Sequence, residues 1–300
     1  MTLSRRDVLA AGAMTLTGAL QPPFAKAAEK KKKLVMIAGS PSHGPGDHEF
    51  NAGVRLLAKC LENFPGLETV VFLNGYPKDD SAFDTADAIV CYADGGSNHP
   101  LVREKHLERI GKLMAKGVGL MCMHYGVEVP KDLGGPEFKE WIGGYYEHMY
   151  SCNPMWSPEF KEFPKHPVCN GVKPFSIRDE WYFNMRFRDE KSITPILSAK
   201  PSDAVRDGPY VYPRGPYKHI QDAKGRSEAM MWVTERKDGG RGCGFTGGHT
   251  HRNWKDDNFR KVVLNALVWL CTLEVPADGV KSEVSEDEIK ANWDPKGKKK

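Results

Sequence analysis

Apolar and polar residues form alternating blocks from residue 33 to residue 273, and these blocks predict strands and helices in turn. The short apolar runs are typical of strands covered on both faces of a parallel sheet. They lie at residues 34–38, 67–73, 88–92 and 118–123. Apolar residues at helical spacing separate them, over residues 48–62 and from Pro100 onward. This order predicts parallel β/α units and a doubly wound, mostly parallel α/β sheet.

The second half of the chain is less regular. Residues 128–170 hold many Pro, Gly and aromatic residues and a short helical pattern at 138–142, which predicts a loop-rich lid insertion. Further strands are expected at residues 175–183, 193–197, 230–234 and 242–246, the last two joined as a hairpin by Asp238-Gly239-Gly240. A final helix is expected over residues 256–273, with one apolar face.

The N-terminus reads as a targeting segment. Arg5-Arg6, a mildly apolar run at residues 8–20 and Ala25-Lys26-Ala27 match a twin-arginine signal with its cleavage site. The apolar run is too short to be a stable membrane anchor. We therefore expect residues 1–28 to be a signal peptide, the twin-arginine export machinery to be a partner, and the mature protein to be periplasmic.

The remaining chain is expected to form one folded domain, residues 29–275, followed by a polar, charged tail, residues 276–300. The formal net charge is +4, and the signal segment contributes about half of it. Much of the other basic character lies at residues 30–33 and 296–300, which we expect to be solvated. Because no interior basic stripe is interleaved with aromatic residues, the composition argues against nucleic-acid binding.

The seven cysteines do not form a metal-binding pattern. They are scattered, odd in number and without a C-x-x-C pair. An exported protein can form disulfides, and Cys152 with Cys169, both in the loop-rich middle, is the best candidate bridge. The others fall mostly in predicted strands and helices, where we expect buried thiols.

The apolar run at 118–123 ends at a residue with chemical potential. His124 would sit at the carboxyl end of a central strand, where open α/β sheets place their ligands. A sharp strand-to-helix elbow needs small neighbours two residues away on each side. Cys122 and Gly126 satisfy this for His124, whereas an elbow at Cys122 would have the bulky Leu120 and His124. The spacing favours His124 and leaves Cys122 as a weaker alternative.

Other histidines and carboxylates cluster in predicted loop ends. They are His43, Asp47, His48, Glu49, Glu147, His148, Asp179, Glu180, His249 and His251. Imidazole and carboxylate groups that converge from several loops are the ligands of a divalent-metal or acid/base site. No H-x-x-x-H or H-E-x-x-H motif is present. The alternative interpretation is structural, with His43 and His48 near a helix start, His148 on the surface and Asp179-Glu180 a solvated pair.

Glu180 has a stronger case than most of this set. It lies between apolar and aromatic neighbours, where an unpaired carboxylate is costly, so it is expected to be paired or to face a ligand. The aromatic residues near these loops fit either stacking on a sugar ring or ordinary core packing. They are Tyr125, Tyr145, Tyr146, Trp156, Trp181 and Trp254.

Five separated motifs, in order, resemble the trehalose-utilisation (ThuA-like) family. They are the segment from Ser42 to Glu49, the strand ending at His124, Ile142-Gly143-Gly144 leading to His148, Asp179-Glu180-Trp181-Tyr182, and the stretch from Gly247 through Asn253-Trp254 to Trp269. The resemblance implies a fold similar to class I glutamine amidotransferases, flavodoxin-like, with His124 where those enzymes carry a cysteine. It also implies a role in carbohydrate use, particularly of oxidised disaccharides, and a site at His48, Glu49, His124, His148, Glu180 and His249.

The leading hypothesis is a metal-assisted or acid/base enzyme that acts on a small carbohydrate, with zinc or manganese as the expected ion and no nucleotide cofactor. The expected catalytic residues are His124, Glu180 and His249. The expected metal ligands are His48, Glu49, His124 and His148, and the expected substrate-binding residues are Tyr125, Tyr146, Trp181 and Trp254. Two alternatives remain at this stage, a periplasmic sugar-binding protein without turnover and an amidotransferase- or protease-like hydrolase that uses Cys122.

Overall fold

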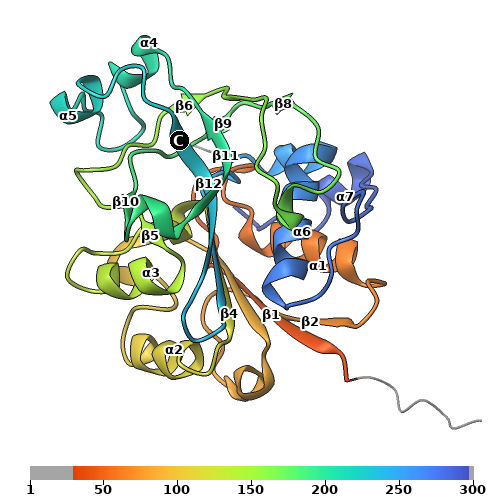
Figure 1. Cartoon of the computed structure of the whole chain (residues 1–300). Helices are drawn as coiled ribbons and strands as arrows, with labels where there is room; N and C mark the ends of the chain where they lie inside the picture. The colour runs from red at the N-terminus through yellow and green to blue at the C-terminus, as the bar shows by residue number, and fades with distance from the viewer. Residues whose placement is uncertain (1–29, 297–300) are drawn as a thin grey trace, which may run out of the picture. The chain divides into compact units, whose positions relative to one another are not determined.

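A seven-stranded sheet positions every other element of the folded unit (Figure 1). Its strand order is β11-β12-β13-β4-β3-β1-β2. The strands are β1 (Lys32–Ala38), β2 (Leu67–Phe72), β3 (Ala88–Tyr92), β4 (Gly119–Met123), β11 (Thr194–Ala199), β12 (Glu228–Glu235) and β13 (Arg241–Phe245). Neighbouring strands are parallel from β2 to β13, and β12 pairs antiparallel with β13 and β11. The mostly parallel α/β sheet and the hairpin are therefore confirmed.

The computed structural model describes residues 30–296. The expected signal peptide, residues 1–28, lies outside this range. Within the described residues, no helix is both long enough and apolar enough to cross a membrane.

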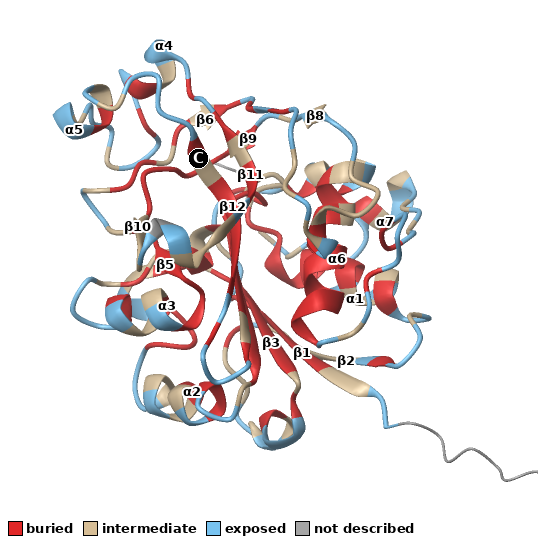
Figure 2. Cartoon of the chain, viewed as in Figure 1, coloured by how far each residue is buried: buried red, intermediate tan, exposed pale blue. Residues whose placement is uncertain are grey.

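Alternating strand residues build two separate cores. In β1, Leu34 and Met36 face one core and Val35 and Ile37 the other, because successive side chains of a strand point to opposite faces. Helices α1 (Phe50–Leu61) and α6 (Asp257–Leu270) cover the first face, and α2 (His106–Met114) and α3 (Gly135–Trp141) cover the second. The central strands β3, β4 and β13 are accordingly buried along almost their whole length, whereas the edge strand β2 is mostly half-buried (Figure 2).

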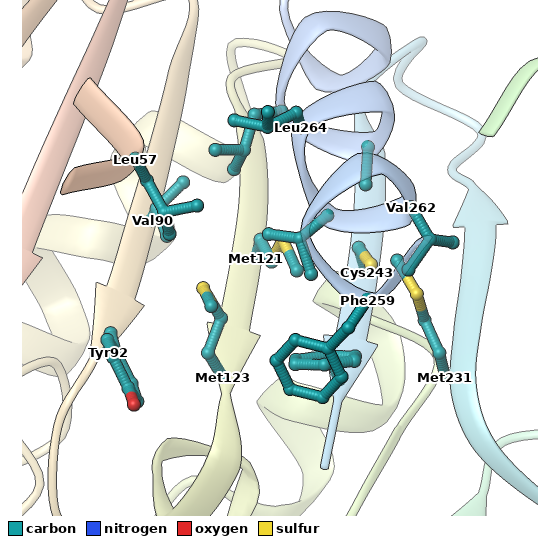
Figure 3. Packing of buried hydrophobic residues seen from close by; sticks show 14 of the residues in the cluster. Leu57, Val90, Tyr92, Met121, Met123, Met231, Cys243, Phe259, Val262 and Leu264 are labelled. Atoms are coloured by element: carbon teal, nitrogen blue, oxygen red, sulfur yellow. The ribbon is translucent and has the colours of Figure 1, made fainter. Parts of the chain in front are cut away.

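The central strand β4 is fixed from the α6 side by tight apolar packing. Met121 and Met123 belong to the same buried cluster as Phe259 of α6 (Figure 3). All three side chains are fully buried. Burying an apolar side chain of this size contributes roughly 1.5–3 kcal/mol, so the strand that precedes His124 has little freedom to shift.

The middle of the chain consists of short strand pairs instead of long elements. β5 (Gly144–Tyr145) pairs with β10 (Arg186–Phe187), β6 (Met155–Trp156) with β9 (Asp179–Glu180), and β7 (Glu159–Phe160) with β8 (Phe175–Ser176). Two one-turn helices follow, α4 (Asp203–Arg206) and α5 (Lys218–Gln221). The single strand expected at residues 175–183 is wrong, because β8 and β9 pair with different partners.

Two other local predictions are also corrected. The helix expected from Pro100 begins at His106, because Glu104 has a φ of 59°, which an α-helix cannot contain. All seven cysteines are free, so the candidate bridge between Cys152 and Cys169 does not form. Cys152 is instead a buried thiol that pairs through its backbone with Phe183.

The described part of the polar, charged tail, residues 276–296, packs against the domain. Val280 and Ile289 are buried, and α7 (Glu286–Lys290) starts with a capping box between Ser285 and Glu288. Further along, the Lys296 ammonium lies 3.2 Å from Glu49 Oε1, and both side chains are buried. Apolar positions in an otherwise polar segment therefore hold the C-terminal segment, residues 276–296, in place.

The Lys296–Glu49 ion pair generates a stability prediction. Removing one partner of a buried pair leaves an uncompensated charge and typically costs about 3–5 kcal/mol. We expect Lys296→Met to lower the free energy of unfolding of the mature chain by about 3 kcal/mol in urea titrations. The matched control is Lys290→Met, at an exposed lysine of the same segment, which should change it by less than about 0.5 kcal/mol. A Lys296→Met effect as small as the control would contradict burial of the pair.

Candidate metal and acid–base site

Four loops that follow parallel strands bring histidines and carboxylates together. Asp94 follows β3 and His124 follows β4 directly, while His48 lies in the loop after β1 and His249 in the loop after β13. The carboxyl ends of parallel strands open on one edge of the sheet, where this class of fold binds ligands. The site is therefore placed by the sheet itself.

Three of the histidines have a strained backbone. His43, His48 and His124 have φ values of 60°, 48° and 52°, in the left-handed region that non-glycine residues rarely adopt. His124 occupies the expected elbow, between β4 and a 3₁₀ turn, His124–Val127. A Cβ added to Gly126 would lie 3.2 Å from the carbonyl oxygen of Cys91, which explains the small residue there.

Four side chains converge on one point. His48 Nε2 lies 2.9 Å from His124 Nε2 and 3.0 Å from His249 Nδ1. Glu180 Oε2 lies 2.7 Å from His249 Nδ1 and 3.8 Å from His124 Nε2. The four ligand atoms all lie within 4.8 Å of one another. Three imidazoles and one carboxylate thus share a centre about the size of a single ion.

The outward-facing nitrogens have acceptors of their own. His124 Nδ1 lies 3.0 Å from the carbonyl oxygen of Thr246, which can only accept a hydrogen bond. His48 Nδ1 lies 2.8 Å from Asp94 Oδ1, and His249 Nε2 lies 3.6 Å from Asp47 Oδ1. These partners assign the protons to the outer nitrogens of His124 and His48. In their neutral forms, both residues therefore direct a lone pair from Nε2 to the centre.

The electrostatics of the cluster require a positive charge there. Burial and the neighbouring imidazoles lower the pKa of His124 and His48, so both are neutral at physiological pH. Burial also disfavours a charged His249, but hydrogen bonds to Asp47 and Glu180 outweigh it and raise the pKa of His249 to about 9. With no ion bound, the proton of His249 is the charge that holds the cluster together.

The neighbouring carboxylates Asp179 and Glu180 have different roles, one in fixing a loop and the other at the centre. Both carboxylate oxygens of Asp179 accept backbone hydrogen bonds, from Gly248 at 2.7 Å and from Thr250 at 3.1 Å, which fixes the loop that carries His249. Glu180 faces the centre with Oε2 and accepts from Asn153 Nδ2 with Oε1 at 2.7 Å. Burial raises the pKa of both carboxyl groups.

A cavity of about 310 Å³ opens onto the cluster. Its lining residues are His43, His48, Tyr125, Glu128, His148, Asn153, Glu180, Tyr182, Val211 and Tyr212. None of them is Lys or Arg. Glu128 faces this cavity, and burial together with the nearby Glu180 charge raises its pKa to about 8. The cavity is thus acidic, and one of its carboxyl groups is largely protonated at neutral pH.

Comparison with known proteins places the chain in a family. The family model described as trehalose utilisation, ThuA, matches residues 42–270. The chain belongs to the ThuA family. Membership links it to carbohydrate utilisation, and every residue of the converging cluster lies inside the matched range. No curated protein matches the chain.

Solved structures of ThuA-like proteins share the fold. One from Parabacteroides merdae is 17% identical with a TM-score of 0.55, and the alignment covers 86% of this chain and 94% of that one. Another from Bacteroides uniformis is 16% identical with a TM-score of 0.55, and the shares are 83% and 95%. At this identity the likeness establishes the architecture, which agrees with the flavodoxin- and amidotransferase-like expectation.

Not every residue that ThuA membership suggested lies at the centre. Glu49 points away from it, because its carboxylate pairs with Lys296 and accepts from the Asp294 amide at 2.9 Å. His148 is half-exposed at the rim of the cavity, with Nδ1 3.9 Å from Glu128 Oε1. These two positions do not fit the metal-ligand roles expected for them, and the structure supplies His249 and Glu180 instead.

The four aromatic residues expected to bind the substrate lie in two different environments. Tyr125 lines the cavity. Trp181 and Trp254 are fully buried and pack against Phe259 in the core, and Tyr146 is buried behind Tyr182. These three rings therefore cannot stack on a ligand in this conformation, and ordinary core packing is the better interpretation.

The structure argues against Cys122 as the nucleophile of a hydrolase. Cys122 is fully buried in β4, and burial, with Cys91 and Cys243 alongside, holds the pKa of its thiol well above the usual range. A nucleophilic cysteine needs an accessible, easily ionised thiol. The glutaminase- or protease-like alternative is therefore wrong on this geometry.

Several site residues were missed by the sequence reasoning. The Tyr182 hydroxyl lies 3.2 Å from His124 Nε2, Glu128 and Asn153 line the cavity, and Asp94 orients His48. Asp94 lies two residues after the end of the strand expected at residues 88–92, so its position near a strand end was an available signal. Glu128 and Asn153 come from the irregular insertion, where the sequence carries no periodicity to place them.

The raised pKa of Glu128 generates a pH prediction. An unfolded chain releases this proton near its ordinary value of 4.5, whereas the folded protein keeps it to about pH 8. Stability from this group is therefore complete at low pH and is lost as the pH rises towards 8. We therefore compare the free energies of unfolding of Glu128→Gln and wild type, obtained from thermal unfolding of the chelator-treated proteins. The difference should shift in favour of Glu128→Gln by about 1–3 kcal/mol between pH 5 and pH 8.

The control for this experiment is Glu159→Gln, at an exposed glutamate. Its stability should follow the wild-type pH profile. If the pH profile of unfolding free energy for Glu128→Gln also runs parallel to that of wild type, Glu128 is ionised in the folded state at neutral pH.

Proposed function

We propose that this protein is a metal-assisted enzyme that acts on a neutral sugar or glycoside. It would bind zinc or manganese through His48, His124, His249 and Glu180. The single observation that carries the proposal is the double orientation of the histidines, each with one nitrogen at the shared centre and the other facing an acceptor.

The donor set fits a transition-metal ion. Metal-bound histidines almost always direct the second ring nitrogen to a carboxylate or a carbonyl oxygen, as His48, His124 and His249 do here with Asp94, Thr246 and Asp47. Neutral imidazole suits zinc and similar ions, and Glu180 adds charge compensation. When bound, such an ion polarises a carbonyl or hydroxyl oxygen of the substrate as a Lewis acid.

Proton transfer is assigned to Glu128. Both oxygens of Glu180 are already engaged, with His249 and with Asn153, whereas Glu128 faces the cavity. A carboxyl group with a pKa near 8 can both give and take a proton at neutral pH, which is the property of an effective general acid or base. The Tyr182 hydroxyl, next to His124, is placed to hydrogen-bond a substrate oxygen.

The charge of the cavity favours an uncharged substrate. Glu128 and Glu180 line it, and no cationic side chain does. Apart from the centre itself, a phosphate or carboxylate group would find no cationic side chain in this lining, whereas sugar hydroxyls can donate to its carboxyl groups. The link of the family to carbohydrate utilisation supports the same substrate class. An oxidised disaccharide is consistent with it, because its carbonyl oxygen is the group that a Lewis acid polarises most effectively.

A role as a binding protein without turnover is less consistent with this geometry. Hydroxyl recognition needs hydrogen-bonding groups, but it does not need three imidazoles packed at about 3 Å, two of them on a strained backbone. Strain of this kind persists where a functional site requires it.

We also propose that the protein works in the periplasm after twin-arginine export, on the basis of Arg5-Arg6 and the segment that follows.

The metal assignment is tested by elemental mass spectrometry of the mature protein, purified without chelators and loaded with zinc or manganese. We expect close to one ion per chain in wild type and in His148→Ala. His48→Ala and His124→Ala should lose at least about tenfold in affinity, because each removes a ligand. Equal metal content in all four proteins would contradict the cluster, and so would a wild type that stays metal-free after loading.

Turnover is measured on the same metal-loaded proteins, with trehalose and an oxidised form of trehalose as substrates and product analysis by NMR. Glu128→Gln should keep the ion and slow turnover by about 10²–10⁴-fold, the usual contribution of general acid–base catalysis. Unchanged turnover in Glu128→Gln would remove its proton-transfer role. A metal-loaded wild type that converts neither sugar nor any related glycoside would favour plain binding.

A further inference from the structure

Two exposed apolar side chains lie at the rim of the cavity. Among the described residues, only a few large hydrophobic side chains are exposed, and two of them, Val211 and Tyr212, line this cavity. Tyr212 is 70% exposed and still lines the cavity. Its ring centre lies 6.1 Å from that of His148. Large exposed apolar groups beside a cavity mark a binding surface.

The rim is tied to the chemical centre through Asn153. The Asn153 side chain donates to Glu180 Oε1 at 2.7 Å and accepts from the Tyr212 amide at 3.1 Å. The backbone carbonyl oxygen of Asn153 accepts from the Val211 amide at 3.3 Å. One residue therefore connects the cluster carboxylate to the backbone that carries Tyr212. This arrangement sets the spacing between the tyrosine ring and the cluster.

The cavity, at about 310 Å³, is at the lower limit of small-molecule pockets, which hold roughly 300–1,000 Å³. Its lining extends from the cluster residues His48 and Glu180 to the exposed Tyr212 and His148. A disaccharide whose first ring contacts the cluster would therefore place its second ring towards Tyr212 and His148.

The interior of the cavity is polar and its rim is aromatic, which matches the polar hydroxyl groups and the apolar face of a sugar ring. The interior offers carboxyl, hydroxyl and imidazole groups to sugar hydroxyls. The rim offers an exposed tyrosine ring, whose electron-rich face attracts the weakly positive C–H groups on the flat face of a pyranose. The order from polar interior to aromatic rim matches a reacting ring held by hydrogen bonds and a second ring held by stacking.

We propose that Tyr212, with His148, forms an outer subsite for the second ring of a neutral disaccharide whose first ring reaches the cluster. This inference rests on the proposed function and names the residue that would distinguish a disaccharide from a monosaccharide. Tyr212 thereby selects the substrate and takes no part in proton transfer or metal binding.

The test compares two probes, an oxidised trehalose and methyl α-D-glucopyranoside oxidised at the same position, by calorimetric titration of the zinc-loaded protein. Wild type should bind the disaccharide more tightly than the methyl glycoside. Tyr212→Ala should weaken disaccharide binding about five- to tenfold, which is the range for loss of one aromatic contact, and leave the methyl glycoside unchanged. Tyr212→Phe should retain wild-type affinity, because it keeps the ring.

Leu133→Ala serves as the matched control, since Leu133 is exposed and does not line the cavity. Equal weakening of both probes by Tyr212→Ala, or no weakening of either, would overturn the outer subsite while the sugar-directed function stands. A wild type that binds neither probe would overturn the proposed function and the subsite together. Measuring the methyl glycoside in the same series separates these two outcomes.

Discussion

The structure of the site depends on the outer hydrogen bonds of His48 and His124. Asp94 and the Thr246 carbonyl oxygen take up the outer nitrogens, so both inner nitrogens face each other as lone pairs at 2.9 Å. Two lone pairs at this distance need a positive charge between or beside them. The protonated form of His249 supplies it without an ion, and a divalent metal supplies it in the proposed enzyme, where its binding would release that proton.

The fold maintains this arrangement from three sides. Parallel strands β3, β4 and β13 end at the same edge of the sheet, and α6 packs on β4. This packing prevents His124 from moving away from the centre. Asp179 fixes the loop of His249 through two backbone amides. On the third side, Lys296 donates to the carbonyl oxygen of His48 at 3.1 Å, so the C-terminal segment supports the first histidine loop. The left-handed backbone of His48 and His124 is tolerated because these surroundings fix it.

The sequence was sufficient for the parts governed by periodicity. The parallel strands, the hairpin and the elbow at His124 follow from apolar runs and small neighbours, and the family resemblance pointed to His48, Glu180 and His249. It could not place Glu49 or His148, because which way a loop side chain points depends on contacts far away in the chain, such as Lys296 for Glu49. The exposed Tyr212 was equally hidden, since its loop carries no helical or strand pattern.

The most direct test of the central claim is an anomalous-difference map from crystals of the mature protein loaded with zinc, with a parallel data set for manganese. The account predicts one peak at about 2.0–2.2 Å from His48 Nε2, His124 Nε2, His249 Nδ1 and Glu180 Oε2. Both maps without a peak among these atoms, with the histidines still at their present separations, would contradict it. The cluster would then be a proton-sharing network instead of a metal centre.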